Sequence, residues 1–476
     1  MKYDPRFRRT KIVATVGPAS SDEDVIQAMI EAGVAVMRIN SSHGTPEFRG
    51  AVMDRIRNVR DRLRQSVAIL VDLQGPRIRV GALAESRQLV EDGEVSFAPE
   101  DEATGDDIPT TYGQLAEDVT VGTRILLDDG LLEVTVTAVH GAKITCRVVH
   151  GGELKSHKGM NLPDIRVSAP SVTEKDRDDI ALAVEHGADF VGLSFVRRHQ
   201  DVESLRGLLP AGMRIVSKIE KAAALEDLTS IVDTTDAIMV ARGDLGVELP
   251  FEEVPVAQKR VISLANQFGR PVITATQMLE SMIEKPRPTR AEASDVANAV
   301  LDGTDAVMLS AETAVGAYPV EAVQAMARIV ERTESAHMIA EIPERQRLNR
   351  RFADEGPETA DAIAAATCAA AEMLRVPLIV CFTHSGFTAR KLAACRPSVP
   401  IIGLTTESST FHRLALTWGV HAALEESQPT YDRMLALARD YLTSRDYVQE
   451  GDRVVVTAGV PFDTPGTTNL LKVEVV

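Results

Sequence analysis

Short apolar runs recur along this chain, and the segments between most of them have helical patterns. Continuous apolar runs rich in Val and Ile are typical of strands buried on both faces of a parallel sheet. The intervening helical patterns include residues 21–33, which begin with acidic residues after Ser21 and end at Gly33. Eight such strand–helix units predict a (β/α)₈ barrel. The predicted strands span residues 11–17, 34–40, 67–73, 190–195, 214–220, 237–243, 271–277 and 306–312.

Two further regions do not fit the barrel, because a chain of 476 residues is too long for one hydrophobic core. Residues 81–165 contain short alternating runs with glycine turns, which predict a small inserted β-barrel domain where a lid would lie. After residue 340, an alanine-rich helix at 361–374 and four strand-like runs predict a C-terminal α/β domain. The predicted domains are therefore the barrel (1–80 and 166–339), the lid (81–165) and a C-terminal α/β domain (340–476).

Charge and hydropathy exclude several classes of protein. The net charge of −17 argues against a general nucleic-acid surface, which needs a basic face. No apolar run approaches the roughly 18 residues of a membrane span, and the N-terminal segment has no signal-peptide stretch, so we expect a cytoplasmic protein. Widely spaced cysteines without a CxxC pair indicate reduced thiols rather than disulfides or a zinc site. These cysteines are Cys146, Cys368, Cys381 and Cys395.

Functional groups in a (β/α)₈ barrel gather where the strands run into loops. Glu220 and Asp244 lie at the ends of two neighbouring predicted strands, and paired carboxylates suit Mg²⁺ or Mn²⁺. Lys218 lies on the same rim and could hold an anionic oxygen beside the metal. Together with arginines, these residues predict metal-assisted chemistry on a phosphorylated carboxylate. The other predicted rim residues are Arg38, Asn40, Ser42, Asp72, Arg77, Arg79, Thr276, Ser310 and Glu312.

Nine motifs, in this order, resemble those of the pyruvate kinase family. The resemblance covers nearly the whole chain and is weakest in the inserted domain and after residue 340. It implies transfer of the phosphoryl group of phosphoenolpyruvate to ADP, giving pyruvate and ATP in the last step of glycolysis, by a homotetramer. The motifs are MRINSSHGT (37–45), VDLQGPRIR (71–79), LDDG (127–130), KGMNLP (158–163), SKIE (217–220), ARGDLG (241–246), ATQMLESM (275–282), PTRAEASDVANAVLDG (288–303) and MLSAETAVGAYP (308–319).

On the substrate side, the resemblance assigns roles to five of the rim residues, whereas Ser310 and Glu312 resemble support residues of the barrel rim. Glu220 and Asp244 match the divalent-metal ligands, so Mg²⁺ or Mn²⁺ is the implied cofactor. Lys218 matches the lysine that contacts the transferring phosphoryl group and the enolate oxygen, and Arg38 matches the phosphate-clamping arginine. Thr276 matches the threonine implicated in protonating the methylene carbon. The implied substrate-binding set is Arg38, Lys218, Gly243, Asp244 and Thr276, with the backbone N–H groups of Gly243 and Asp244 on the carboxylate.

On the nucleotide side, no GxxxxGK[ST] loop is present, so the phosphates are not held as in P-loop enzymes. Arg79 matches a second catalytic arginine that faces the nucleotide. Asp129 resembles a lid residue that reaches the site on closure, with an ordinary β-turn aspartate as the alternative. His43 also has a structural alternative, as a hydrogen-bonded histidine. The implied nucleotide-binding set is Asn40, His43, Arg79, Asp129 and Lys158.

One segment departs from the potassium-dependent members of the family. Those members typically read DTKGPEIRT, in which a glutamate helps a monovalent-cation site. The segment that begins at Asp72 here reads DLQGPRIRV and resembles the potassium-independent group, in which a lysine replaces that glutamate. We predict that K⁺ is not required, because the guanidinium of Arg77 substitutes for it. The vestigial monovalent site would consist of Asn40, Ser42, Asp72 and Leu73.

The C-terminal domain carries a candidate effector site. Thr383, Ser385, Gly386 and Thr388 follow a predicted strand and could form a phosphate-holding turn at a helix N-terminus, with an ordinary helix cap as the alternative. The family's common arginine is replaced there by Phe387.

Two other functions stay open at this level. A metal-dependent aldolase or lyase acting on pyruvate or phosphoenolpyruvate would explain the two carboxylates but not the lid. A catalytically silent regulator, built around the C-terminal domain, would explain the effector turn but not the rim.

Overall fold

The structure is a computed structural model that describes residues 5–163, 165, 167–335, 358–428, 430–460 and 468–476. Eight parallel strands close into a barrel in the order β1-β16-β15-β14-β13-β12-β3-β2, which confirms the predicted fold class. All eight predicted strands are present. They are β1 (Lys11–Val16), β2 (Val36–Asn40), β3 (Ala68–Asp72), β12 (Phe190–Leu193), β13 (Arg214–Ile219), β14 (Ala237–Ala241), β15 (Val272–Ala275) and β16 (Ala306–Leu309).

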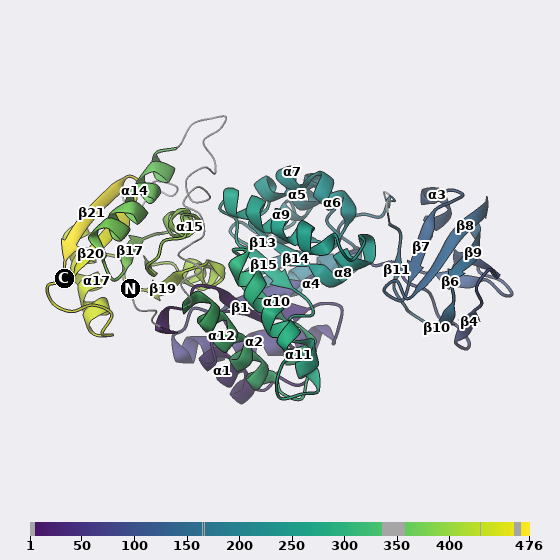
Figure 1. Ribbon diagram of the computed structural model, residues 1–476, viewed down its shortest axis with the longest axis horizontal. Coiled ribbons are helices and arrows are strands. Elements are labelled where there is room, and N and C mark those ends of the chain that lie inside the picture. The colour runs from purple at the N-terminus through teal and green to yellow at the C-terminus, as the bar shows by residue number, and fades with distance from the viewer. Residues whose placement is uncertain (1–4, 164, 166, 336–357, 429, 461–467) are drawn as a thin grey trace.

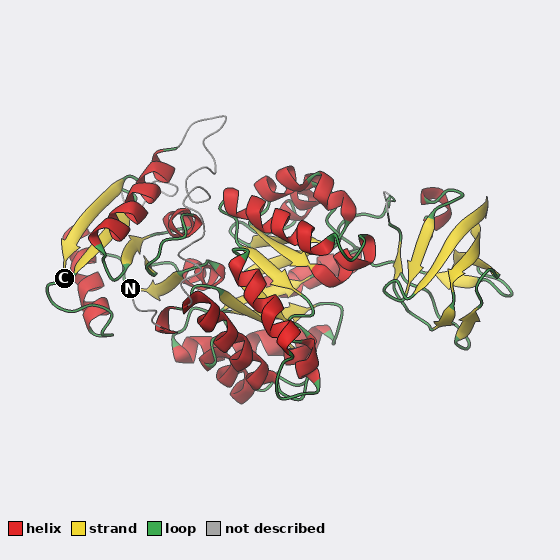
Figure 2. Ribbon diagram, in the orientation of Figure 1, coloured by secondary structure: helices red, strands yellow, loops and turns green. Residues whose placement is uncertain are grey.

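Helices surround the barrel strands (Figures 1 and 2). Two of them start at capping boxes, in which Thr173 pairs with Asp176 and Thr289 pairs with Glu292. The helices of the barrel are α1 (Glu23–Glu31), α2 (Pro46–Leu63), α4 (Glu174–Glu185), α5 (His199–Arg206), α6 (Ala222–Glu226), α7 (Leu228–Thr234), α8 (Arg242–Glu248), α9 (Val254–Gln267), η2 (Glu280–Ile283), α10 (Arg290–Leu301), α11 (Ala311–Ala314) and α12 (Pro319–Ser335).

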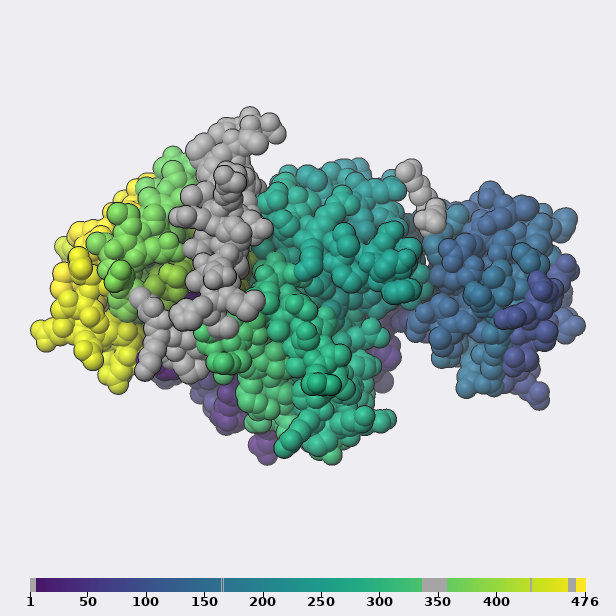
Figure 3. All heavy atoms as spheres, in the orientation of Figure 1, coloured from purple at the N-terminus to yellow at the C-terminus, as the bar shows by residue number. Residues whose placement is uncertain are grey.

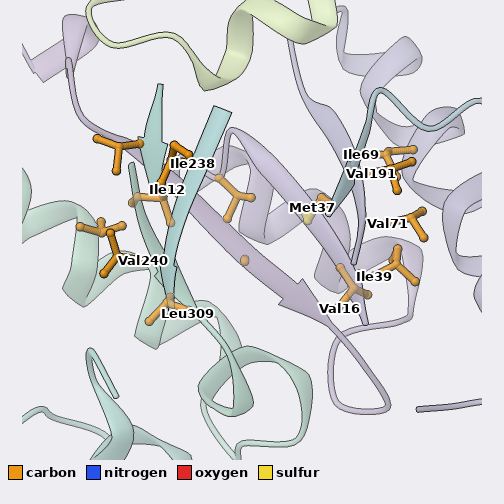
Figure 4. Close-up of a cluster of buried hydrophobic side chains, with 14 of the residues drawn as sticks. Ile12, Val16, Met37, Ile39, Ile69, Val71, Val191, Ile238, Val240 and Leu309 are labelled. Atoms are coloured by element: carbon orange, nitrogen blue, oxygen red, sulfur yellow. The ribbon is translucent and has the colours of Figure 1, made fainter. Parts of the chain in front are cut away.

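The barrel strands are apolar on both faces. On β1, Ile12 and Ala14 belong to the cluster that includes the helices, whereas Val13 belongs to the cluster inside the barrel. Figure 4 shows the first cluster, with Ile12, Met37 and Ile238 among its labelled side chains. Successive side chains point to opposite faces, and both faces are buried. These strands therefore appear in the sequence as continuous apolar runs.

The lid is a separate β lobe with its own core around Phe97, Ile125, Val134 and Ile144 (Figure 3). Its strands form a six-stranded sheet, β11-β7-β8-β9-β5-β6, and a two-stranded sheet, β10-β4. The predicted boundary at 165/166 adjoins residues 164 and 166, which lie outside the described residues. The lid elements are β4 (Arg87–Leu89), β5 (Glu94–Pro99), β6 (Ile108–Thr110), α3 (Leu115–Asp118), β7 (Arg124–Leu127), β8 (Leu132–His140), β9 (Lys143–His150), β10 (Gly152–Leu154) and β11 (Met160–Asn161).

The C-terminal domain is a five-stranded sheet, β19-β18-β17-β20-β21, in which only β21 is antiparallel to its neighbour. It lies on the opposite side of the barrel from the lid (Figure 1). The predicted boundary at 339/340 lies outside the described residues. The elements are α14 (Thr359–Leu374), β17 (Ile379–Phe382), α15 (Phe387–Ala394), β18 (Ile401–Thr405), α16 (Ser408–Arg413), η4 (Leu414–Leu416), β19 (Val420–Leu424), α17 (Tyr431–Thr443), β20 (Arg453–Ala458) and β21 (Leu470–Val475), together with the N-terminal η1 (Pro5–Phe7).

Strand β19 was not among the predicted strands. It is an edge strand in which only Val420 and Ala423 are buried, and His421 interrupts the apolar run, so it lacks the signal of a strand buried on both faces. Among the residues that the structure describes, no helix is long and apolar enough to cross a bilayer.

Candidate active site

Charged side chains from three barrel strands meet at the carboxyl ends of the strands. Arg38 on β2 donates from Nε to Asp72 Oδ2 at 2.8 Å and from Nη1 to Thr15 Oγ1 at 2.9 Å. Lys218 Nζ on β13 lies 3.3 Å from Asp72 Oδ1 and 2.7 Å from Glu220 Oε1. Parallel strands present their carboxyl ends at one rim, so residues far apart in sequence form one continuous network here.

The pKa values of this network show how it distributes charge. Burial alone would raise the pKa of Asp72, but the charges of Lys218 and Arg38 outweigh burial and lower it. Burial would lower the pKa of Lys218, but Asp72 and Glu220 outweigh burial and raise it. The pKa of Glu220 is raised, by burial first and also by the nearby charge of Asp244, with Lys218 opposing. Lys218 therefore stays charged in a nearly buried position, while Glu220 and Asp244 repel each other.

The repulsion between Glu220 and Asp244 is the feature that fits a divalent cation. A cation between two such oxygen donors would relieve that repulsion, and hard oxygen ligands are the ones that Mg²⁺ prefers. No group of three or more His, Cys, Asp or Glu side chains suited to a metal occurs within the described ranges. A two-carboxylate site is nevertheless ordinary for Mg²⁺, which usually takes its other ligands from water and substrate oxygens.

Ser194 and Phe195 are site residues that the sequence analysis missed. Ser194 Oγ accepts a hydrogen bond from Lys218 Nζ at 2.8 Å and donates to the Leu73 carbonyl at 2.7 Å. The Phe195 N–H donates to Glu220 Oε2 at 2.7 Å, with Phe195 in the left-handed region at φ 55°. Both residues directly follow β12, so applying the strand-end rule to the fourth strand would have found them.

Thr276 lies at the end of β15 in a strained conformation. Its φ of 66° is unusual for a β-branched residue and costs about 1–3 kcal/mol. Its Oγ1 accepts from the Gly243 N–H at 2.8 Å, and its carbonyl accepts from Arg242 Nη2 at 2.7 Å. Arg242 is in turn held by Asp295 at 2.7 Å. The structure thus joins Thr276 to Gly243, and the N–H predicted to hold a substrate carboxylate here donates to the threonine.

The predicted nucleotide-side residues are more exposed than the rim network, and the contacts of most of them are in or beside the lid. Arg79 Nη1 donates to the His157 carbonyl at 2.8 Å. Lys158 Nζ lies 2.8 Å from Asp128 Oδ1. Arg77 Nη2 lies 3.8 Å from Oδ1 of Asp129.

On the barrel side of the nucleotide set, Asn40 Oδ1 accepts from the Ser42 N–H at 3.1 Å, and His43 is exposed.

A cleft of about 300 Å³ separates barrel and lid. Residues of both parts line it, among them Arg77, Met160, Phe195, Lys221, Asp244 and Glu248.

Glu312 has a structural role at the rim, and the predicted effector turn lies in another domain. Glu312 is fully buried and accepts from the Leu279 N–H at 3.1 Å and the Ser310 N–H at 2.7 Å, so it holds two rim loops together. The predicted effector turn lies in the C-terminal domain, where Gly386 precedes α15 at φ 78° and Thr388 Oγ1 lies 2.8 Å from Thr468 Oγ1.

The rest of the effector turn is also in place between β17 and α15. Thr383 follows β17 and is buried, and the Ser385 carbonyl accepts from Arg390 Nη1 at 3.2 Å. The strand–turn–helix arrangement matches the prediction for these residues, and their ligand stays a prediction.

Comparisons with known proteins agree over the whole chain. Residues 7–323 match the family model "Pyruvate kinase, barrel domain", and residues 361–474 match "Pyruvate kinase, alpha/beta domain". A pyruvate kinase of Geobacillus stearothermophilus is 45% identical, over 98% of this chain and 80% of the relative. A pyruvate kinase of Clostridium acetobutylicum is 41% identical, over 99% of this chain and 100% of the relative.

The fold gives the same result. The crystal structure of a pyruvate kinase from Cryptosporidium parvum superposes with a TM-score of 0.92 at 33% sequence identity, covering 100% of this chain and 98% of the other. Since sequence and fold agree from the first barrel strand to the last strand of the C-terminal domain, this chain belongs to the pyruvate kinase family and is a phosphotransferase of glycolysis.

Proposed function

We propose that phosphoryl transfer from phosphoenolpyruvate to ADP takes place at the rim formed by Arg38, Asp72, Lys218 and Glu220. The observation that carries this proposal is the position of Lys218, a nearly buried ammonium held between two carboxylates. A fixed positive charge in such a site stabilises negative charge that develops in a transition state. The related pyruvate kinases support the same reaction.

Phosphoryl transfer asks a protein for positioning and charge neutralisation rather than for covalent chemistry. In our proposal Arg38 and Lys218 hold the phosphoryl group, and Lys218 neutralises the charge that grows on the enolate oxygen as the phosphorus–oxygen bond breaks. Thr276 lies where the methylene carbon takes up its proton. A Mg²⁺ or Mn²⁺ ion held by Glu220 and Asp244 would add Lewis-acid charge at the phosphate and enolate oxygens.

The nucleotide would bind between the rim and the lid. Arg79 and Lys158 would neutralise its phosphates, and Asp129 would reach the site when the lid closes. The solvent exposure of Lys158 and Asp129 supports a role that begins only with the nucleotide bound, because lids commonly complete a site on closure. On the barrel side, we propose Asn40 and His43 as further nucleotide contacts.

We also propose that the reaction does not require K⁺. Asp72 already lies between two cationic side chains, and the Leu73 carbonyl accepts a hydrogen bond from Ser194 Oγ. Leu73 has an apolar side chain that cannot bind a cation, and Arg77 lines the cleft as a fixed charge. Each of these features reduces the need for a monovalent cation at this position.

The test is pyruvate formation from phosphoenolpyruvate and ADP with Mg²⁺, in Na⁺ and in K⁺ at matched ionic strength. We expect similar turnover in both salts for the wild type and for Arg77→Lys, and K⁺ activation for Arg77→Glu. Many-fold activation of the wild type by K⁺ would refute the Arg77 hypothesis while leaving the kinase in place.

The same assay separates the alternatives. A kinase needs ADP and produces ATP in step with pyruvate, an aldolase or lyase needs no ADP, and a silent regulator turns over nothing. Lys155→Met, at an ion pair with Glu153 in which both side chains are more than half exposed, is a suitable control for the effects of mutation.

The family also suggests how the enzyme is organised and regulated. We propose a cytoplasmic homotetramer with a phosphorylated effector at the turn formed by Thr383, Ser385, Gly386 and Thr388. Light scattering would test the assembly, since four chains of 51.5 kDa predict a particle of four times that mass. Calorimetric titration with sugar phosphates and nucleoside monophosphates would test the turn.

A further inference from the structure

Two cysteines that are 27 positions apart in the sequence come together in the C-terminal domain. Cys368 lies on α14, and its Sγ is 3.9 Å from the Leu392 carbonyl oxygen. Cys395 caps the end of α15, and its Sγ is 3.5 Å from the Lys391 carbonyl oxygen. Since Lys391 and Leu392 are consecutive residues of α15, both sulfur atoms lie against neighbouring carbonyls of one helical turn.

The two thiols differ in access and reactivity. Cys368 is buried, whereas Cys395 is partly exposed. A hydrogen bond from the Cys368 side chain lowers the pKa of Cys395 and outweighs burial and the charge of Asp361, which raise it; the charge of Lys391 also lowers it. Cys395 is therefore the thiol of the pair that an oxidant in the solvent can reach, and the Cys368 side chain lies within hydrogen-bonding distance of it.

The other two cysteines provide an internal contrast. Cys146 and Cys381 are fully buried in different domains, and burial raises the pKa of both, that of Cys146 to about 12. Buried thiols with raised pKa values react slowly with oxidants. The four cysteines thus divide into one adjacent pair with a partly exposed member and two buried thiols that react slowly.

We propose that Cys368 and Cys395 are a redox modification site, at which a hydroperoxide converts the two thiols into a reversible intramolecular disulfide. The Cys395 thiolate attacks one peroxide oxygen, which breaks the oxygen–oxygen bond, gives a sulfenic acid and releases hydroxide. The Cys368 sulfur then attacks the sulfenic sulfur, and the sulfur–oxygen bond breaks with loss of water. The hydroxide takes up the proton that the Cys395 thiol gave up on forming the thiolate, so the two thiols lose two electrons and hydrogen peroxide becomes two waters. A dithiol reductant reverses the reaction.

The position of the pair connects it to the barrel. Arg396, the residue after Cys395, has a φ of 50° and ion-pairs with Asp305 of the barrel at 3.1 Å. Its guanidinium also lies 4.7 Å from the centre of the Trp418 ring. A disulfide at Cys395 would therefore join α14 to the turn through which α15 contacts the barrel.

The experiment uses the full-length wild type treated with hydrogen peroxide, then with N-ethylmaleimide, then digested without reduction. We expect the free thiols counted after denaturation to fall from the four of the sequence to two, with a linked peptide containing residues 368 and 395. Dithiothreitol should abolish the linked peptide and restore all four thiols.

Matched variants locate the effect. Cys381→Ala should still lose two thiols, whereas Cys368→Ser and Cys395→Ser should give no linked peptide. Because the central measurement is made on the wild type, a variant that folds poorly does not affect it. Four free thiols after treatment that fully oxidises a small dithiol would refute the proposal, and so would a sulfinic acid at Cys395 with Cys368 still free.

Discussion

Two lysines at opposite ends of the barrel show how differently the two ends treat charge. Lys218 lies near the carboxyl end of β13 and Lys11 starts β1 at the amino end. Both side chains are largely buried, yet the pKa of Lys218 is raised while that of Lys11 is lowered to about 7. Burial opposes the charge of both amines, so their neighbours decide the outcome.

The neighbours reflect the task of each end. Lys218 lies between Asp72 and Glu220, both within ion-pair distance. Lys11 Nζ instead donates to the Val420 carbonyl of the C-terminal domain at 2.6 Å. Burial and the charge of Arg8 lower its pKa, and the charges of Glu334 and Asp305 raise it by too little to reverse the shift. The carboxyl end of the barrel thus stabilises a buried ammonium with two carboxylates. At the amino end, Lys11 joins the barrel to the C-terminal domain.

The largest effect should come from removing the carboxylate shared by two cations at the rim. In Asp72→Asn, Arg38 and Lys218 lose that partner in a buried site, which costs about 3–5 kcal/mol of unfolding free energy. Urea unfolding at pH 7 measures this. Asp92→Asn, at an ion pair whose aspartate is 84% exposed, is the control and should change the free energy by less than about 0.5 kcal/mol. Equal effects of the two changes would mean that the rim holds charge no differently from the surface.

The second prediction concerns catalysis. Lys218→Met removes the ammonium and keeps the length of the side chain, and we expect kcat to fall by about 10²–10³-fold, as for loss of one electrostatic stabiliser. Steady-state kinetics at saturating substrates measure it. Lys11→Met, an identical change at the other end of the barrel, should leave kcat within about twofold, because Lys11 contacts the C-terminal domain rather than the rim. A loss below tenfold for Lys218→Met would remove the lysine from the proposed mechanism.

The third prediction uses the lowered pKa of Lys11. Its pKa is 10.5 in the unfolded chain and about 7 in the folded protein, so between these values the unfolded chain binds more protons. The free energy of unfolding must therefore rise with pH across this window. Relative to Lys11→Met, the wild type should gain roughly 3 kcal/mol between pH 7 and pH 10.

Unfolding midpoints of both proteins at several pH values give this difference. Lys155→Met, at an ion pair with Glu153 in which both side chains are more than half exposed, serves as the control and should follow the wild type at every pH. A difference between wild type and Lys11→Met that stays constant with pH would show that Lys11 keeps its charge in the fold.

The sequence predicts the barrel well for a physical reason. Strands buried on both faces need apolar residues at every position, and all eight of them carry this signal. The edge strand β19 has one solvated side and lacks the signal. The sequence thus predicts a strand reliably where both of its faces are buried, and less reliably where only part of the strand is buried.

Contacts between side chains are harder to predict than segments. The strand-end rule selects Arg38, Asp72 and Lys218, but not which of them pair, because rotamers and strand register set those distances. The proximity of Cys368 and Cys395 depends on how α14 packs against α15. No local pattern encodes that packing.

The smallest effect on stability should come from the lid, at the exposed side chain of Asp129. This prediction tests whether the charge-holding rim ends at the barrel. Asp129 has a side chain that is 70% exposed and lies 3.8 Å from Arg77, so Asp129→Asn should change the unfolding free energy by less than about 0.5 kcal/mol. If this aspartate reaches the nucleotide on closure, KM for ADP should rise about two- to fivefold, the size of a contact worth 0.5–1 kcal/mol, with KM for phosphoenolpyruvate unchanged. Initial rates with each substrate varied separately measure both constants. A rise in KM for phosphoenolpyruvate instead would place Asp129 on the substrate side and extend the charge-holding rim into the lid.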